Sequence, residues 1–244
     1  MVRRWIFLSC LVVLFVLRAS CHASTSNSAS NSADDSTATL EQHPFAGAAP
    51  VQIQLGLYIT DLAMVDEASE NFEIQGYIYA SWKDDRLIDK TALGSDKLRK
   101  LAPEAGWNPQ LDIENVRAFK SFRYGFFSFP DGTVNWEERF DAILSAEYFL
   151  RRFPFDHQSL FVIVQPAISP ARPRHSLVEF APADSATGLG PETYLAAWDI
   201  EAIRYSRSVA HTNSAGLDVP RAEFEIVVKR RSVFTSGRFF CRFS

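Results

Sequence analysis

The stretch from Phe72 to Lys83 constrains the fold most strongly, because apolar and polar side chains alternate along its whole length. Successive side chains of a β-strand point to opposite faces of the sheet. One face of this predicted strand therefore belongs in a core and carries Phe72, Ile74, Gly76, Ile78, Ala80 and Trp82. The other face carries the polar and tyrosine side chains Glu73, Gln75, Tyr77, Tyr79, Ser81 and Lys83.

Similar strand signals recur along the chain, with little helical periodicity between them. Predicted strands cover residues 51–61, 111–117, 119–127, 133–144, 159–165, 176–180, 196–205 and 222–230. Pro130 to Thr133 forms a predicted tight hairpin turn. The one predicted helix is short and runs from Ser95, its N-cap, to Leu101. Roughly ten strands with so little helix predict an all-β fold, either a sandwich or a barrel.

The N-terminal segment has the pattern of a targeting signal. Arg3 and Arg4 precede an apolar run at residues 6–17, which is too short to span a bilayer comfortably, and small residues follow it. Residues 1–23 are therefore predicted to be a secretory signal peptide, with an uncleaved membrane anchor as the alternative. Residues 24–49 are predicted to be a low-complexity leader. The folded part would then lie on the periplasmic or extracellular side of the cell membrane.

Composition and motifs argue against several classes of function. The 244 residues carry a formal charge of −4, and removal of residues 1–23 takes away three arginines and no acid, which leaves −7. Such a charge argues against a nucleic-acid partner. Cys241 is the one cysteine beyond the signal region, so a mature intrachain disulfide is excluded. The sequence has no nucleophile elbow, glycine-rich phosphate loop or His/Cys cluster at metal spacing, and we therefore predict no enzyme, cofactor or metal site.

The loop from Phe153 to Gln158 joins two apolar segments and carries two phenylalanines around Pro154. Pro154 fixes its own φ and keeps Phe153 out of the helical region. An exposed turn rarely carries two such large apolar side chains. The loop is therefore predicted to pack against something outside this chain, with an ordinary hairpin that buries its own small core as the alternative.

Several short motifs occur in a characteristic order. They are Trp82 to Leu87, Trp107 to Leu111 with Asn115, Asp131 to Val134, Phe153 to Gln158, Trp198 to Ile200 and Lys229 to Arg231. In this order, residues 50–234 resemble the extracellular ligand-binding domain of pentameric ligand-gated ion channels, the Cys-loop receptor superfamily. The resemblance is best to a bacterial proton-gated member, through residues 65–72 and 198–201. The two cysteines that name the family would fall at Ala146 and Leu160, and their absence is typical of bacterial members.

The resemblance implies a ten-stranded immunoglobulin-like sandwich that assembles as a homopentamer, with a ligand site between neighbouring subunits. The positions that match this site are Tyr77, Glu114, Ala167 and Tyr205. Glu114 and Ala167 stand where aromatic side chains would help to form a cation cage, so a complete cage for an amine agonist is not expected. Surface or interface packing is the alternative for Tyr77 and Tyr205.

The resemblance also implies a gating junction, where bottom loops press on a transmembrane domain and bury their phenylalanines against it. Glu70 matches a position tied to proton sensing, and Arg231 matches the arginine that pairs with this loop and with Asp156. Protonation of a glutamate removes a charge pair and can bias a two-state junction. The alternative is that the glutamates are solvated and the other two charges are structural ions. The whole set assigned to the junction is Glu67, Glu70, Phe153, Pro154, Phe155, Asp156 and Arg231.

Residues 235–244 stand where the first membrane helix of this family would begin, but they contain two arginines. Charge is costly inside a bilayer, so we expect a domain that is truncated before its pore. The first hypothesis is the ligand-binding, proton-sensing domain of a bacterial channel, with identical subunits, a small-molecule ligand or protons, and the missing transmembrane domain as partners. The alternatives are a free-standing soluble pentamer that binds a small molecule, and an unrelated secreted sandwich such as a carbohydrate-binding module.

Overall fold

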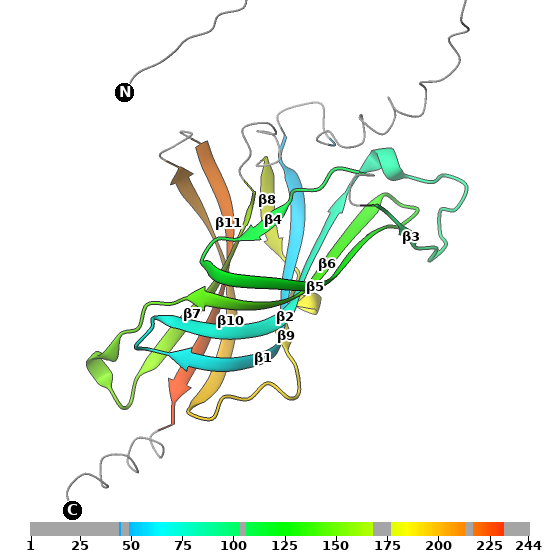
Figure 1. Cartoon of the computed structure of the whole chain (residues 1–244). Helices are drawn as coiled ribbons and strands as arrows, with labels where there is room; N and C mark the ends of the chain where they lie inside the picture. The colour runs from blue at the N-terminus through cyan, green and yellow to red at the C-terminus, as the bar shows by residue number, and fades with distance from the viewer. Residues whose placement is uncertain (1–43, 45–48, 103–105, 168–176, 213–216, 232–244) are drawn as a thin grey trace, which may run out of the picture.

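The computed structural model describes residues 44, 49–102, 106–167, 177–212 and 217–231, and its strands form two facing sheets (Figure 1). The larger sheet has seven strands and the smaller sheet has four. The larger sheet contains β1 (Val51–Asp66), β2 (Asn71–Lys83), β3 (Arg99–Lys100), β5 (Val116–Ser128), β6 (Thr133–Ser145), β8 (Val178–Pro182) and β9 (Gly188–Leu189). The smaller sheet contains β4 (Leu111–Ile113), β7 (His157–Pro166), β10 (Trp198–Thr212) and β11 (Leu217–Arg230). The predicted all-β sandwich is confirmed.

Strands that are distant in the sequence lie side by side in both sheets. The larger sheet has the order β3-β5-β6-β2-β1-β8, and β9 also pairs with β1. Its pairs are antiparallel except that β8 and β9 lie parallel to β1. The smaller sheet has the order β10-β11-β7-β4, with every pair antiparallel. Crossovers of this kind are typical of immunoglobulin-like sandwiches.

The alternation predicted for β2 is confirmed, since every second residue from Phe72 to Trp82 is buried. β7 shows the same alternation from the opposite sheet. Phe72 and Phe140 from the larger sheet and Phe224 from the smaller sheet are fully buried in the shared core. Burial of one such side chain stabilises the fold by roughly 1.5–3 kcal/mol. The core therefore fixes the strand register and with it the direction of the polar faces.

The single strand predicted across residues 111–117 is instead two strands, β4 and β5, that belong to different sheets. Asn115 stands at the crossing between them. Its amide nitrogen donates to the carbonyl oxygens of Ser145 in β6 (3.0 Å) and Phe161 in β7 (2.8 Å). One polar side chain therefore ties the two sheets together at the point where the chain passes from one to the other.

The helix predicted from Ser95 to Leu101 is wrong. Part of this segment forms β3, which pairs with the end of β5, and the Leu101 N–H donates to the carbonyl of Phe126 (2.8 Å). Leu101 is also buried in the core. A short isolated helix is only marginally stable, so sheet pairing and burial outweigh the capping signal. Helical structure in the described residues consists of short 3-10 turns, η1 (Asp85–Leu87), η2 (Leu150–Arg152) and η4 (Asp184–Ala186).

The hairpin turn predicted at Pro130 to Thr133 is confirmed between β5 and β6. Gly132 adopts a positive φ of 79°, which a glycine reaches without steric cost. The Thr133 N–H donates to the Asp131 carboxylate (2.9 Å), so the turn also satisfies its own backbone.

Three of the sequence predictions concern segments that the structure does not describe. The signal peptide at residues 1–23 and the tail at residues 235–244 lie outside the described residues, as does nearly all of the leader at residues 24–49. These remain predictions. The described part of the chain contains no helix with the length and hydropathy of a membrane span.

Candidate functional site

The loop between β6 and β7 is closed at its base by the side chain of Gln158. The Gln158 amide accepts a hydrogen bond from the Phe149 N–H (2.9 Å) and donates one to the Phe149 carbonyl (3.1 Å). The same amide nitrogen donates to the Asp156 carboxylate (2.6 Å). Gln158 and Asp156 are both buried, so water competes little for these hydrogen bonds.

Arg230, at the end of β11, joins this loop to the turn between β1 and β2. Its Nε and Nη2 atoms donate to the two carboxylate oxygens of Asp156, at 2.7 and 3.0 Å. Nη2 also pairs with the carboxylate of Glu67. The side chains of Arg230, Asp156 and Glu67 are 9%, 2% and 28% exposed. One nearly buried cation is therefore shared by a buried carboxylate and a more accessible one.

Aromatic rings enclose the same guanidinium group. Its central carbon lies 4.1 Å from the ring centre of Trp198 and 4.9 Å from that of Phe153, distances at which a cation is attracted to the ring face. Burial raises the pKa of the Asp156 carboxyl, but hydrogen bonds from Arg230 and Gln158 outweigh that effect and hold the pKa below its ordinary value. Asp156 therefore stays ionised in mild acid.

Arg231 does not occupy this position, and the prediction that it pairs with Asp156 is wrong by one residue. Its side chain bonds instead to Asp199 (2.7 Å) and to the hydroxyl of Tyr194 (2.7 Å). Adjacent residues of an extended chain point to opposite sides, so only one of two neighbouring arginines can reach the loop. Three consecutive basic residues stand at 229–231, so the sequence alone does not show which of their side chains turns inward.

Glu70 is the last residue of the turn between β1 and β2, and its side chain is exposed. Its backbone adopts a positive φ of 52°. Its carbonyl accepts a hydrogen bond from the Ala146 N–H (3.0 Å), at the start of the β6–β7 loop. The turn that contains Glu67 and Glu70 is thus fastened to this loop through Arg230 and through a backbone contact.

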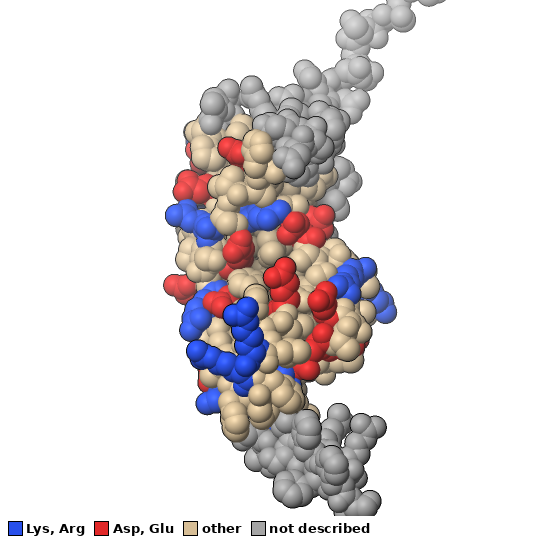
Figure 2. Space-filling model, turned by 90° about the vertical axis from the view of Figure 1, so that its left-hand side faces the viewer, with Lys and Arg blue, Asp and Glu red and all other residues tan. Residues whose placement is uncertain are grey.

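The outer surface of the β6–β7 loop is apolar. Phe149 and Phe155 are each 70% exposed, and Leu150 and Phe153 are 48% and 44% exposed. At the lower end of the coloured surface, Figure 2 shows a largely uncharged area below a group of basic side chains. Soluble monomers rarely expose a group of large apolar side chains without a partner. This exposure favours a loop that packs outside the chain over a hairpin with its own core.

Sequence reasoning missed one titratable pair beside the junction. His157 begins β7, and its Nε2 lies 3.4 Å from a carboxylate oxygen of Glu201 in β10. Lys229 of β11 is the register partner of His157. A β-bulge between Ile200 and Ala202 leaves Glu201 without a partner on β11, and bulges of this kind re-aim a side chain. In the sequence, the only sign of this pair was that His157 directly follows Asp156 of the junction.

Two of the predicted ligand-site positions flank the edge strand β4. Glu114 pairs with Arg221 of β11 (2.7 Å), whose Nε also donates to Gln165 of β7 (3.3 Å). Ala167 follows β7, and its N–H donates to the carbonyl of Gln110 (2.7 Å). The carboxylate of Glu114 is therefore already engaged by a cation of the same chain.

The two predicted tyrosines lie in different sheets and in different environments. Tyr77 of β2 lies on the outer face of the larger sheet, with its ring stacked on that of Tyr79 at 5.9 Å between ring centres. Tyr205 of β10 packs edge-on against the core residue Phe224, at 5.5 Å. Burial raises the pKa of Tyr205 to about 12, and its buried hydroxyl has no hydrogen-bond partner among the described residues. The structure does not bring Tyr77 and Tyr205 together within one chain.

Comparison with known proteins places this sandwich in a family. Residues 39–166, slightly more than half of the chain, match the family described as neurotransmitter-gated ion-channel ligand binding domain. This chain belongs to that family. The resemblance inferred from the order of the motifs is thereby confirmed.

Relatives of this ligand-binding domain include bacterial and animal proteins. A proton-gated ion channel from Gloeobacter violaceus is 29% identical over 153 residues, which cover 62% of this chain and 42% of that protein. The gamma-aminobutyric acid receptor subunit theta of Mus musculus is 27% identical over 51% of this chain and 20% of its own length. The acetylcholine receptor subunit alpha-type acr-15 of Caenorhabditis elegans is 24% identical over 45% of this chain and 24% of its own length. The chain thus spans less than half of each relative.

Within this ligand-binding domain the predicted residues separate into two groups. The structure brings together Glu67, Phe153 and Asp156, with Arg230 in the place predicted for Arg231. Of the four predicted ligand positions, Glu114 and Ala167 flank β4, whereas Tyr77 and Tyr205 lie in different sheets. At Ala146 and Leu160, where the family's cysteines were expected, the loop is held by the hydrogen bonds of Gln158 instead of a disulfide.

Proposed function

We propose that this chain is the extracellular, proton-sensing domain of a bacterial pentameric ligand-gated channel, and that five identical copies act on a transmembrane domain. The observation that carries the proposal is the cation of Arg230, which is shared between Asp156 in the apolar loop and Glu67 in the neighbouring turn. The 29% identity to a protein named proton-gated ion channel supports the same assignment. The exposed phenylalanines of the loop supply a contact surface for the transmembrane domain.

The carboxylates that pair with Arg230 are buried to different degrees, and this difference suggests which carboxylate responds to protons. Asp156 keeps its charge in mild acid, because its hydrogen bonds lower its pKa. We therefore assign the proton to the more accessible carboxylates of the turn, Glu67 and Glu70. Protonation of Glu67 removes one of the two negative charges that hold Arg230. Two arrangements of the junction that differ in this contact also differ in proton affinity, so pH shifts their populations.

We call the four predicted ligand positions, Tyr77, Glu114, Ala167 and Tyr205, the ligand face. Their surroundings favour protons over a cationic amine as the agonist of this domain. Tyr205 turns into the core, and Arg221 neutralises Glu114. Of the four predicted positions, Tyr77 alone keeps an aromatic ring on the outer surface. A cation cage needs several such rings around one charge. A small molecule that binds between subunits here would therefore depend on polar contacts.

Currents from this domain, joined to a pentameric-channel membrane domain that is itself insensitive to pH, test the proposal. Glu67→Gln imitates permanent protonation, so we expect activation at a higher pH than in the unmodified chimera. Glu70→Gln tests the second position of the turn in the same way. Glu192→Gln changes an exposed carboxylate outside the junction and should leave the pH response as it was. An unchanged response in both turn variants would contradict proton sensing by this turn.

A further inference from the structure

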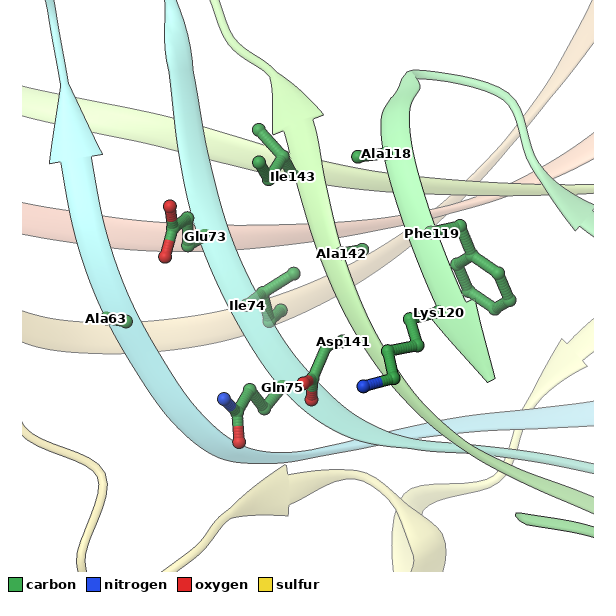
Figure 3. Close-up of a pocket in the computed structure, with 10 residues that line it drawn as sticks. All are labelled: Ala63, Glu73, Ile74, Gln75, Ala118, Phe119, Lys120, Asp141, Ala142 and Ile143. Atoms are coloured by element: carbon green, nitrogen blue, oxygen red, sulfur yellow. The ribbon is translucent and has the colours of Figure 1, made fainter. Parts of the chain in front are cut away.

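A hollow lies on the outer face of the larger sheet, where β1, β2, β6 and β5 run side by side and the smaller sheet lies behind (Figure 3). Its volume is about 270 Å³, which suits a molecule of few heavy atoms better than a drug-sized ligand. The small side chains Ala63 and Ala118 leave this space between larger neighbours. The polar side chains that line it are Glu73, Gln75, Lys120 and Asp141.

Asp141 lacks a hydrogen-bond donor at one of its oxygens. Its Oδ1 atom is buried and has no hydrogen-bond partner in the part of the chain that the structure describes. The strand register places Asp141 between Gln75 of β2 and Lys120 of β5. The Lys120 ammonium lies over the ring of Phe122, 4.5 Å from its centre, and leaves Oδ1 unpaired. A buried oxygen without a donor is unfavourable, so the hollow favours a ligand that brings N–H groups.

The surroundings of Asp141 fit a positive charge. Figure 3 shows Asp141 on β6 and both Glu73 and Gln75 on the neighbouring strand β2, with Glu73 directed toward β1 and the Phe119 ring on the β5 side. A primary ammonium group carries three N–H donors and one positive charge, and hydrogen bonds between ions are the stronger ones. The two carboxylates outnumber the single lysine, which disfavours an anion. A short alkyl chain would rest on the alanine side chains.

We propose that this hollow binds a small primary alkylamine, whose ammonium group donates to Asp141 and Glu73. The proposal goes beyond proton sensing and does not involve the Arg230 junction. It also differs from the predicted ligand site, because none of Tyr77, Glu114, Ala167 and Tyr205 lines the hollow. Lys120 acts as the competitor of the ligand, because rotation of its side chain can bring its own ammonium to the same oxygen.

Titration of n-butylamine into the isotope-labelled chain, followed by NMR amide shifts, tests the proposal. We expect saturable shifts around residues 73–75, 118–120 and 141–143. Asp141→Asn should weaken binding about tenfold, the usual contribution of a hydrogen bond between charged groups. Lys120→Gln should strengthen binding, because it removes the competitor, and Glu192→Gln should change nothing. Tetramethylammonium, a cation without N–H donors, should bind more weakly than butylamine.

Three results would overturn the proposal. The first is no saturable binding at roughly 100 mM amine, where even a millimolar site is nearly full. The second is equal affinity in the wild type and Asp141→Asn. The third is a lower melting temperature without stronger amine binding in Lys120→Gln, which would make Lys120 the permanent partner of Asp141. If Asp141→Asn does not fold, Ala118→Leu fills the hollow without changing a charge and should abolish binding.

Discussion

The junction and the ligand face both depend on an arginine paired with a carboxylate, but the two pairs differ in depth. At the junction, Arg230 and Asp156 are 9% and 2% exposed and share two hydrogen bonds. At the ligand face, Arg221 and Glu114 are 24% and 34% exposed and share one. A buried charge that loses its partner is costly, whereas an exposed pair contributes only about 0–1 kcal/mol. The same residue types therefore couple two segments at the junction and contribute little at the ligand face.

Arg230→Met should have the largest effect, because it leaves the carboxylate of Asp156 buried without a cation. Removal of one partner from a buried pair costs about 3–5 kcal/mol, which urea denaturation of the purified chain measures as the loss in the free energy of unfolding. Arg231→Met is the matched control, because its pair with Asp199 is 28% and 54% exposed and should contribute under about 1 kcal/mol. Equal losses in the two variants would contradict the assignment of the buried position to Arg230.

Asp156→Asn should change how stability depends on pH. The folded-state pKa of Asp156 is lowered, so its ionised form stabilises the fold above the unfolded-state pKa of about 3.9, and this contribution is lost as the pH falls through the folded-state pKa. We expect the variant to be less stable than the wild type at neutral pH and to lose less stability below about pH 4. Thermal unfolding followed by circular dichroism at a series of pH values measures this difference. Parallel acid losses in the two proteins would show that Asp156 titrates alike in the folded and unfolded states.

The contrast between the two pairs also shows what could be predicted from the sequence. The alternation of β2 and the turn at Pro130 to Thr133 depend on neighbouring residues, and both were predicted correctly. The segment from Ser95 to Leu101 was mistaken for a helix because its partner, β5, is distant in the sequence. The choice of Arg230 over Arg231 depends on the register of β11, and a shift by one residue exchanges every side chain between the faces.

Only those residues of the candidate site that belong to the sequence motifs could be predicted. The order of the motifs identified the family, and the resemblance placed Glu67 and Asp156 in one group. In the structure both carboxylates contact Arg230. The pair of His157 and Glu201 belongs to no motif, because a bulge in β10 creates it. Tyr205 lies on the same strand, β10. Apolar and polar residues are mixed along β10, so the sequence does not predict that the Tyr205 side chain faces the core.

Separation of Arg221 from Glu114 should have a small effect that depends on salt. Glu114→Gln removes the charge and keeps the shape of the side chain, and we expect a loss of at most about 1 kcal/mol. The loss should shrink in high salt, because exposed pairs are screened, and denaturation at two ionic strengths measures this. A loss as large as that of Arg230→Met, or one that salt leaves unchanged, would mean that the ligand-face pair is buried in the assembled protein.

Tyr205→Phe should have the smallest effect of all. The hydroxyl of Tyr205 is buried without a hydrogen-bond partner in the described residues, so its removal forfeits no contact and relieves an unfavourable burial. We expect unchanged or slightly higher thermal stability. Tyr148→Phe is the matched control, because that hydroxyl donates to the Asn71 carbonyl (2.8 Å) and its loss should cost about 1 kcal/mol. Equal losses in the two variants would mean that Tyr205 bonds to a group beyond the described residues, such as a neighbouring subunit, and the ligand role predicted for it would then regain support over simple core packing.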